Sequence, residues 1–206
     1  MKSILFLPAC LIALILTASV ASSATTYLID VGNGPVETGF TQMAVTTNTV
    51  TIDSVTFTLT GTAAIGSFDR GAGTPQTDLT RDGAQMNVDG ARYSLAFGGA
   101  GDLQAGEWRV EVWSWDSFPS PTHEYGLITN GSDGAPLVTG AALDPVDPAA
   151  TFTFTSNGTD AYGVFLGETS AFNRTRINAL RLTLIPEPSS LLLSGLGSLL
   201  LLRRRR

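Results

Sequence analysis

The chain has 206 residues, of which 43% are hydrophobic, and its formal net charge is −6 at pH 7. The central part is more acidic, because residues 25–185 hold 17 acidic side chains against 7 arginines and no lysine, a net charge of −10. Nucleic-acid binding needs a positively charged surface, so this balance excludes nucleic acid as an expected partner. The single cysteine excludes a disulfide framework.

The N-terminal residues have the pattern of a secretory signal peptide. Lys2 gives a positive start, Ile4–Val20 form an apolar stretch, and either Ser19-Val20-Ala21 or Ser22-Ser23-Ala24 supplies the small residues that signal peptidase accepts. We therefore expect residues 1–24 to form a signal helix that directs export and is then removed by signal peptidase. The one cysteine lies in this segment, so a hydrophobic core must stabilise what remains.

Residues 25–185 are predicted to form one domain built of β-strands. Their number, about 160, is enough for a single hydrophobic core. Apolar residues alternate with polar ones between closely spaced turn residues, and no stretch has the spacing of an amphipathic helix. Strands are expected at Thr26–Val31 and at these alternating sets: Tyr93, Leu95 and Phe97; Trp108, Val110 and Val112; Phe152 and Phe154; Tyr162, Val164 and Leu166; Leu180, Leu182 and Leu184. This pattern predicts an all-β fold, an antiparallel β-sandwich of jelly-roll type.

One predicted strand, Thr49–Thr60, is irregular. Its apolar residues occupy one parity before Asp53-Ser54 and the other parity after it. Because a shift of one residue sends side chains to the opposite face of a sheet, we expect a β-bulge or a short break at this dipeptide.

The predicted strand Gly106–Asp116 holds the candidate ligand site. Trp113 and Trp115 project to the same side about 7 Å apart, and such an indole pair is a surface on which a sugar ring can stack. Arg109 and Glu111 project to that side as well, where they can hydrogen-bond sugar hydroxyls. The alternative is that a loop covers both indoles and forms a second core layer, which is the more common arrangement for tryptophan.

Three short segments of the domain carry a resemblance to a known fold. They are Ala105-Gly106-Glu107-Trp108-Arg109-Val110 running into Trp115-Asp116, Ile29-Asp30-Val31-Gly32 with Gly39-Phe40-Thr41, and Phe68-Asp69-Arg70 with Arg81-Asp82-Gly83. Together they resemble the malectin-like and galactose-binding-like jelly rolls of secreted bacterial carbohydrate enzymes. The resemblance spans most of Tyr27–Leu184 and implies the fold more strongly than sugar binding, since a shared fold does not establish a shared ligand.

The same resemblance raises the question of a structural calcium ion. Members of this fold class often hold calcium near the N-terminal strand, where Asp30 lies, and Asp69, Asp78 and Asp82 belong to one glycine-rich loop. Calcium takes six to eight oxygen ligands, which three carboxylates and backbone carbonyls can supply. The alternative is that these aspartates are solvated turn residues that hydrogen-bond to their own loops.

Catalytic motifs are scarce in the sequence. His123 is the only histidine, and no Gly-x-Ser-x-Gly motif accompanies it. A pair of carboxylates could perform glycoside hydrolysis, but seventeen acidic residues in one small domain make accidental pairs common. We therefore expect a protein that is not an enzyme and has no catalytic residues.

The C-terminal segment, 186–206, has three parts in a fixed order. Pro186-Glu187-Pro188 keeps the chain extended, and Ser189–Leu202 follows as an apolar stretch. Fourteen helical residues span about 21 Å, which is short for a hydrocarbon core of about 30 Å. The segment ends on a basic cluster that holds its end in the cytoplasm, Arg203, Arg204, Arg205 and Arg206.

This segment resembles the PEP-CTERM sorting signal of Gram-negative bacteria, which the membrane transpeptidase exosortase recognises. The resemblance assigns recognition to Pro186, Glu187 and Pro188, a transient membrane helix to the apolar stretch, and the stop to the arginines. It implies an exported protein that passes through an inner-membrane intermediate to the cell surface or extracellular matrix, with a structural or adhesive role. The alternatives are a carbohydrate-binding module that uses Trp113 and Trp115, with extracellular polysaccharide as partner, and a small polysaccharide-active hydrolase.

Overall fold

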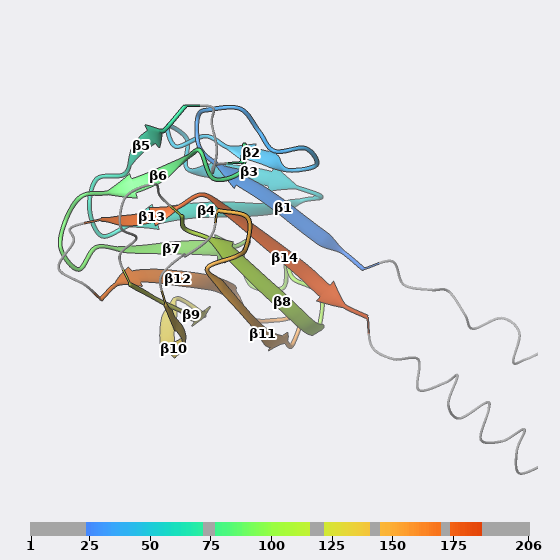
Figure 1. The fold of residues 1–206 in the computed structure, drawn as a ribbon. Coiled ribbons are helices and arrows are strands. Elements are labelled where there is room, and N and C mark those ends of the chain that lie inside the picture. The colour runs from blue at the N-terminus through green and yellow to red at the C-terminus, as the bar shows by residue number, and fades with distance from the viewer. Residues whose placement is uncertain (1–23, 72–76, 116–121, 141–144, 170–173, 187–206) are drawn as a thin grey trace, which may run out of the picture. The chain divides into compact units, whose positions relative to one another are not determined.

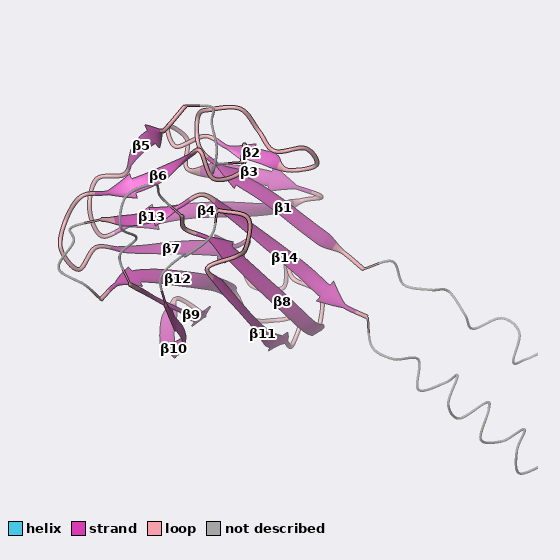
Figure 2. Ribbon diagram, in the orientation of Figure 1, coloured by secondary structure: helices cyan, strands magenta, loops and turns pink. Residues whose placement is uncertain are grey.

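The computed structural model describes residues 24–71, 77–115, 122–140, 145–169 and 174–186. All of its strands belong to one compact unit, Thr25–Ile185. The described residues contain strands and loops without a helix (Figure 2), so the expected all-β class is confirmed. The strands are β1 (Thr26–Val31), β2 (Thr41–Met43), β3 (Thr49–Ile52), β4 (Val55–Gly61), β5 (Gly66–Asp69), β6 (Asp82–Met86), β7 (Arg92–Phe97), β8 (Gly106–Trp113), β9 (His123–Thr129), β10 (Ser132–Gly140), β11 (Ala150–Ser156), β12 (Tyr162–Glu168), β13 (Thr175–Ile177) and β14 (Ala179–Ile185).

These strands form two large sheets and one small one. The five-stranded sheet has the order β11-β8-β14-β1-β2, and the six-stranded sheet has the order β10-β9-β12-β7-β4-β3. A three-stranded sheet, β13-β6-β5, completes the unit. All described pairings are antiparallel except that of β1 with β2, which is parallel. Figure 1 shows β11, β8, β14 and β1 running obliquely in front of β12, β7 and β4.

The core lies between the inner faces of the two large sheets. Aromatic rings join them directly, because Tyr27 of β1 lies 5.2 Å from Phe57 of β4, and Phe154 of β11 lies 5.1 Å from Tyr162 of β12. The alternating residues predicted from the sequence point inward and are buried, apart from Phe152, which is half-buried. Burying one such side chain contributes about 1.5–3 kcal/mol, so this layer holds the sandwich together without a disulfide.

The parity change at Asp53-Ser54 is a chain reversal. Both residues have positive φ, 48° and 71°, as a two-residue type I′ turn requires, and Ile52 pairs directly with Val55 across it. Of the two expected irregularities, a β-bulge or a short break, the structure thus has the break: two antiparallel strands meet at a tight turn. Residues that face each other across such a turn point to the same side of the sheet, which is why the apolar pattern changes parity there.

Other expectations are only partly met or fall outside the described residues. The strand expected to reach Asp116 ends at Trp113, and His123, the single histidine, begins β9. The signal helix and the C-terminal hydrophobic helix fall on residues that the structure does not describe. Within the described ranges, no helix is long and apolar enough to cross a membrane.

Candidate functional site

The sorting signal lies almost wholly outside the described residues. Pro186 is its one described member, and it is exposed immediately after the end of β14. Glu187, Pro188 and the four terminal arginines are not described. The position of Pro186 shows only that the motif begins where the last strand ends.

The predicted ligand-binding residues lie on the outer face of the five-stranded sheet. Arg109, Glu111 and Trp113 alternate along β8 on the side opposite the core. Glu111 pairs across the sheet with Arg181 of β14, whose Nε and Nη2 atoms donate to the carboxylate at 2.6 and 2.7 Å. Arg109 Nε lies 3.5 Å from the same carboxylate. Glu111 therefore already has charged partners on this face.

Both tryptophans of the predicted platform are covered. Trp113 is 4% exposed and Trp115 is 6% exposed. The Trp113 indole N–H donates to the Val146 carbonyl at 3.0 Å, and Phe40 packs edge-on against the ring at 6.3 Å. The Arg181 guanidinium lies 5.4 Å from the ring centre. The two indoles form no open platform in this structure, and a role in ligand binding stays a prediction that requires the covering segments to move.

Two of the four predicted metal ligands face the same loop. Asp30 on β1 and Asp82 on β6 are buried, and they accept backbone hydrogen bonds from Glu37 at 2.8 Å and Gly34 at 2.6 Å. A Cβ on Gly32 would lie 2.0 Å from an Asp82 carboxylate oxygen, so only glycine leaves room for that carboxylate.

The ionisation of these two carboxyls is disfavoured in the folded protein. Burial raises the pKa of Asp30 to about 7, and its hydrogen bond from Glu37 acts in the opposite direction. Burial also raises the pKa of Asp82, and the hydrogen bond from Gly34 again opposes the shift. The negative charge of Asp82 raises the pKa of Asp30 further. Burial thus disfavours the charged form of both carboxyl groups, and in each case desolvation is the largest cause.

The other two predicted ligands are engaged elsewhere. Asp69 and Asp78 both pair with Arg81, at 3.5 and 3.7 Å, and both are largely exposed. Within the described part of the chain, no three or more His, Cys, Asp or Glu side chains are arranged to hold a metal ion. The four aspartates do not form one donor set of the size calcium needs, and calcium binding stays a prediction.

His123 lies inside the protein rather than at a site open to substrate. Its side chain is fully buried, and its ring contacts Tyr125 edge-on at 6.0 Å. Burial lowers the pKa of His123 to about 4, against a smaller opposite effect of a backbone hydrogen bond with Arg174. The imidazole is therefore neutral at physiological pH.

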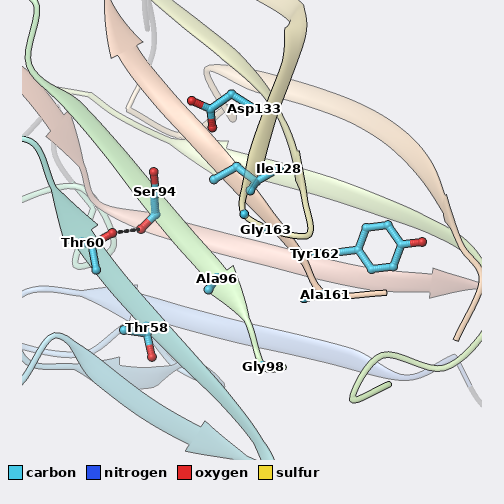
Figure 3. A pocket seen from close by; sticks show the side chains of 11 residues that line it. Thr58, Thr60, Ser94, Ala96, Gly98, Ile128, Asp133, Ala161, Tyr162 and Gly163 are labelled. Atoms are coloured by element: carbon cyan, nitrogen blue, oxygen red, sulfur yellow. Dashed lines mark hydrogen bonds between the residues drawn. The ribbon is translucent and has the colours of Figure 1, made fainter. Parts of the chain in front are cut away.

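A groove that the sequence did not reveal lies on the outer face of the six-stranded sheet (Figure 3). It has a volume of about 380 Å³, within the range of small-molecule sites. Most of its lining is small, with hydroxyl and glycine residues from several strands. The lining residues are Thr58, Thr60, Ser94, Ala96, Gly98, Ile128, Gly131, Asp133, Ala161, Tyr162 and Gly163. The sequence holds one signal for this groove. The outward positions that line it on β4 and β7 carry only small side chains, Thr58, Thr60, Ser94 and Ala96.

Three solved structures that resemble this chain are distant from it in sequence. The YxiM protein of Bacillus subtilis has 16% identity and a TM-score of 0.48, over 79% of this chain and 41% of that one. The CBM36-1 domain of a multidomain xylanase from the hindgut metagenome of Trinervitermes trinervoides has 11% identity and a TM-score of 0.31, over 61% of this chain and 95% of that one. The Agl-KA catalytic domain has 9% identity and a TM-score of 0.31, over 64% of this chain and 28% of that one. The chain thus spans less than half the length of the Bacillus structure, and TM-scores below 0.5 do not establish a shared fold.

Comparison with sequences identifies the tail but not the domain. A search of curated proteins found no match to the chain. The family of the PEP-CTERM protein-sorting motif matches residues 184–206. These residues begin within β14 and include the tripeptide, the apolar stretch and the arginine cluster recognised in the sequence. The chain therefore carries a PEP-CTERM sorting motif, the mark of an exported protein that is sorted by exosortase.

Proposed function

We propose that this protein is a structural or adhesive component of the cell surface or extracellular matrix of a Gram-negative bacterium. The observation that carries the proposal is the PEP-CTERM motif at residues 184–206, which begins in the last strand of a compact β-sandwich and continues to Arg206. Residues 1–24 direct export and are removed by signal peptidase. Residues 186–206 then hold the protein in the inner membrane until exosortase acts at the Pro-Glu-Pro motif.

The domain that is delivered suits a role outside the cell. Its core is continuous between two sheets and needs no disulfide, and its net charge of −10 keeps it soluble and away from other acidic polymers. We take the sandwich to be of jelly-roll type. No catalytic residue enters the proposal, and a polysaccharide-active hydrolase remains the less favoured alternative.

Cell fractionation tests the sorting step. Cells that carry exosortase are expected to release the protein from the inner membrane, whereas matched cells without exosortase retain it there. A Pro186→Ala, Pro188→Ala variant should be retained in both strains, and an Arg109→Lys variant, changed at an exposed site on β8, serves as the control. Equal release of wild-type protein from both strains would contradict the proposal.

Carbohydrate binding through Trp113 and Trp115 is the alternative from the binding class. It requires Phe40 and the Val146 segment to move away from the indole of Trp113. Tryptophan fluorescence that shifts on addition of polysaccharide, and a loss of binding in a Trp113→Ala, Trp115→Ala double variant, would support it.

A further inference from the structure

Small residues leave the middle of the six-stranded sheet open on its outer face. Ala96 of β7 is exposed there, and it pairs with Gly163 of β12, next to Ala161. A Cβ on Gly163 would lie 2.7 Å from the Leu95 carbonyl oxygen and 3.1 Å from the Cα of Ala96, so a larger residue would push the two strands apart. The floor of the groove is therefore backbone and methyl groups.

Hydroxyl groups form one side of this groove. Thr58 and Thr60 stand at alternate positions of β4, and Ser94 stands opposite Thr60 on β7 (Figure 3). The Thr60 hydroxyl donates to the Ser94 carbonyl at 3.3 Å, which leaves its oxygen able to accept. A hydroxyl both donates and accepts, so this row matches a ligand whose own groups do both.

The charge at the rim is already balanced. Among the described residues that line the groove, Asp133 of β10 has the only formal charge. Its carboxylate lies 3.0 Å from the guanidinium of Arg92, which in turn lies over the Phe165 ring at 3.6 Å. The ion pair holds the rim in place and leaves no net positive charge that would attract phosphate, nucleic acid or an acidic polymer.

The apolar part of the lining is too small to anchor a protein or a lipid. Tight protein interfaces depend on large side chains that enter pockets. The largest ring in the lining, Tyr162, is 6% exposed and packs on Phe154 in the core. Ile128, half-buried on β9, contributes the main apolar wall. These dimensions suit the C–H faces of a narrow chain rather than a bulky apolar group.

We propose that this groove binds a neutral polysaccharide chain, with Thr58, Thr60 and Ser94 hydrogen-bonding its hydroxyls and Ala96, Ala161 and Ile128 contacting its C–H groups. The ligand class follows from the paired donors and acceptors, the balanced charge and the shallow backbone floor. The site is separate from Trp113 and Trp115, and it does not depend on whether the tail is processed. Without an exposed aromatic ring the affinity for a short oligosaccharide is on the order of millimolar.

Binding can be measured on the protein recovered from exosortase-carrying cells. The probes are the hexasaccharides of cellulose, xylan, mannan and laminarin, with heparin as the anionic comparison, each titrated by calorimetry at low and high salt. An Ala96→Trp variant fills the groove and should abolish binding. Its matched control is Thr153→Trp, the same new side chain at an exposed position on the outer face of the five-stranded sheet, which should bind as the wild type does.

A second variant keeps the test sharp if Ala96→Trp fails to fold. Thr58→Val with Ser94→Ala removes two hydroxyls without changing the shape of the strands, and it should weaken binding about tenfold. Neutral hexasaccharide binding that is insensitive to salt and lost in these variants supports the site. Absence of binding to every neutral probe, binding unchanged in both groove variants, or binding of heparin alone would overturn it. Each of these outcomes leaves the sorting proposal standing, because fractionation tests that separately.

Discussion

The two large sheets are both built from strands in which inward and outward residues alternate, but the outer face of one sheet is covered and that of the other is open. On the five-stranded sheet the outward positions carry Glu111, Trp113 and Arg181, and these large side chains are covered or paired. On the six-stranded sheet the outward positions carry Thr58 and Ala96, and a groove remains. The large outward side chains of the five-stranded sheet are covered by other segments or paired with each other, whereas the small ones of the six-stranded sheet leave a groove open to solvent. An aromatic pair in a strand is therefore a weak guide to a binding face.

On the outer face of the five-stranded sheet, here called the closed face, removal of the Trp113 indole should have the largest effect on stability. Trp113→Ala deletes a buried ring and leaves the Val146 carbonyl without its donor. We expect the free energy of unfolding to fall by about 3–5 kcal/mol, measured by urea denaturation. Thr153→Ala, at an exposed position of β11 on the same sheet, should change it by less than about 0.5 kcal/mol. A loss below about 1 kcal/mol for Trp113→Ala would mean that this face is not closed in solution.

The closed face should also show a pH dependence through Asp30, which lies in the same row of residues as Trp113 across β14. Its folded pKa, about 7, is above its unfolded value, so the folded state binds the proton more tightly. The protonated Asp30 carboxyl therefore contributes fully to the free energy of unfolding below its unfolded pKa. This contribution is lost as the pH rises through the folded pKa of about 7. Between pH 5 and pH 8 the loss amounts to about 2–3 kcal/mol.

Asp30→Asn isolates that contribution. The amide oxygen can still accept from the Glu37 N–H, but it does not titrate. The free energy of unfolding of each protein is measured at pH 5 and pH 8. Between these two pH values the wild type should lose about 2–3 kcal/mol more than the variant, so the variant gains relative stability at pH 8. Groups common to both proteins, such as His123 with its lowered pKa, cancel in this comparison. Identical pH dependence in the two proteins would contradict the assignment.

A smaller effect is expected from the ion pair on the closed face. Glu111→Gln replaces the bidentate acceptor of Arg181 while keeping its shape. Because Arg181 is partly exposed, the expected loss is only about 1 kcal/mol by urea denaturation. Glu107→Gln, exposed on the same strand, is the control. Equal effects of the two substitutions would show that the Glu111–Arg181 pair has no special role.

The open face should be the most tolerant of change. Thr58→Val and Ser94→Ala each remove a surface hydroxyl from the groove, so each should alter the free energy of unfolding by less than about 0.5 kcal/mol. Thermal and urea unfolding of the single variants measure this. Destabilisation above about 1 kcal/mol would show that these hydroxyls support the fold instead of facing a ligand.

Strands with regular alternation were predictable from the sequence. The core of β7 is as expected, with Tyr93, Leu95 and Phe97 all buried. When a sheet has one buried face, every second residue of a strand points inward, and these inward residues are apolar. At Asp53-Ser54 the sequence predicted a β-bulge or a break but not the chain reversal, since a hairpin and a bulge both change the parity. β10 was missed because it contains Gly134 and Pro136 and its register shifts twice against β9.

The candidate sites depended on pairing that a single sequence does not contain. The burial of Trp113 comes from Phe40 and Val146, which are far from it along the chain. The groove arises only when the register places Ala96 beside Gly163 and Thr58. The tail, in contrast, was recognised from sequence, because a sorting signal is read as a linear motif and needs no tertiary contacts.

The intact mass of the protein recovered from cells with and without exosortase shows directly whether the sorting signal is processed. We expect chains that lack residues 1–24 in both strains, and chains that also lack the segment from around Pro186 only where exosortase is present. Full-length C-termini with Arg206 still attached in exosortase-carrying cells would contradict this expectation.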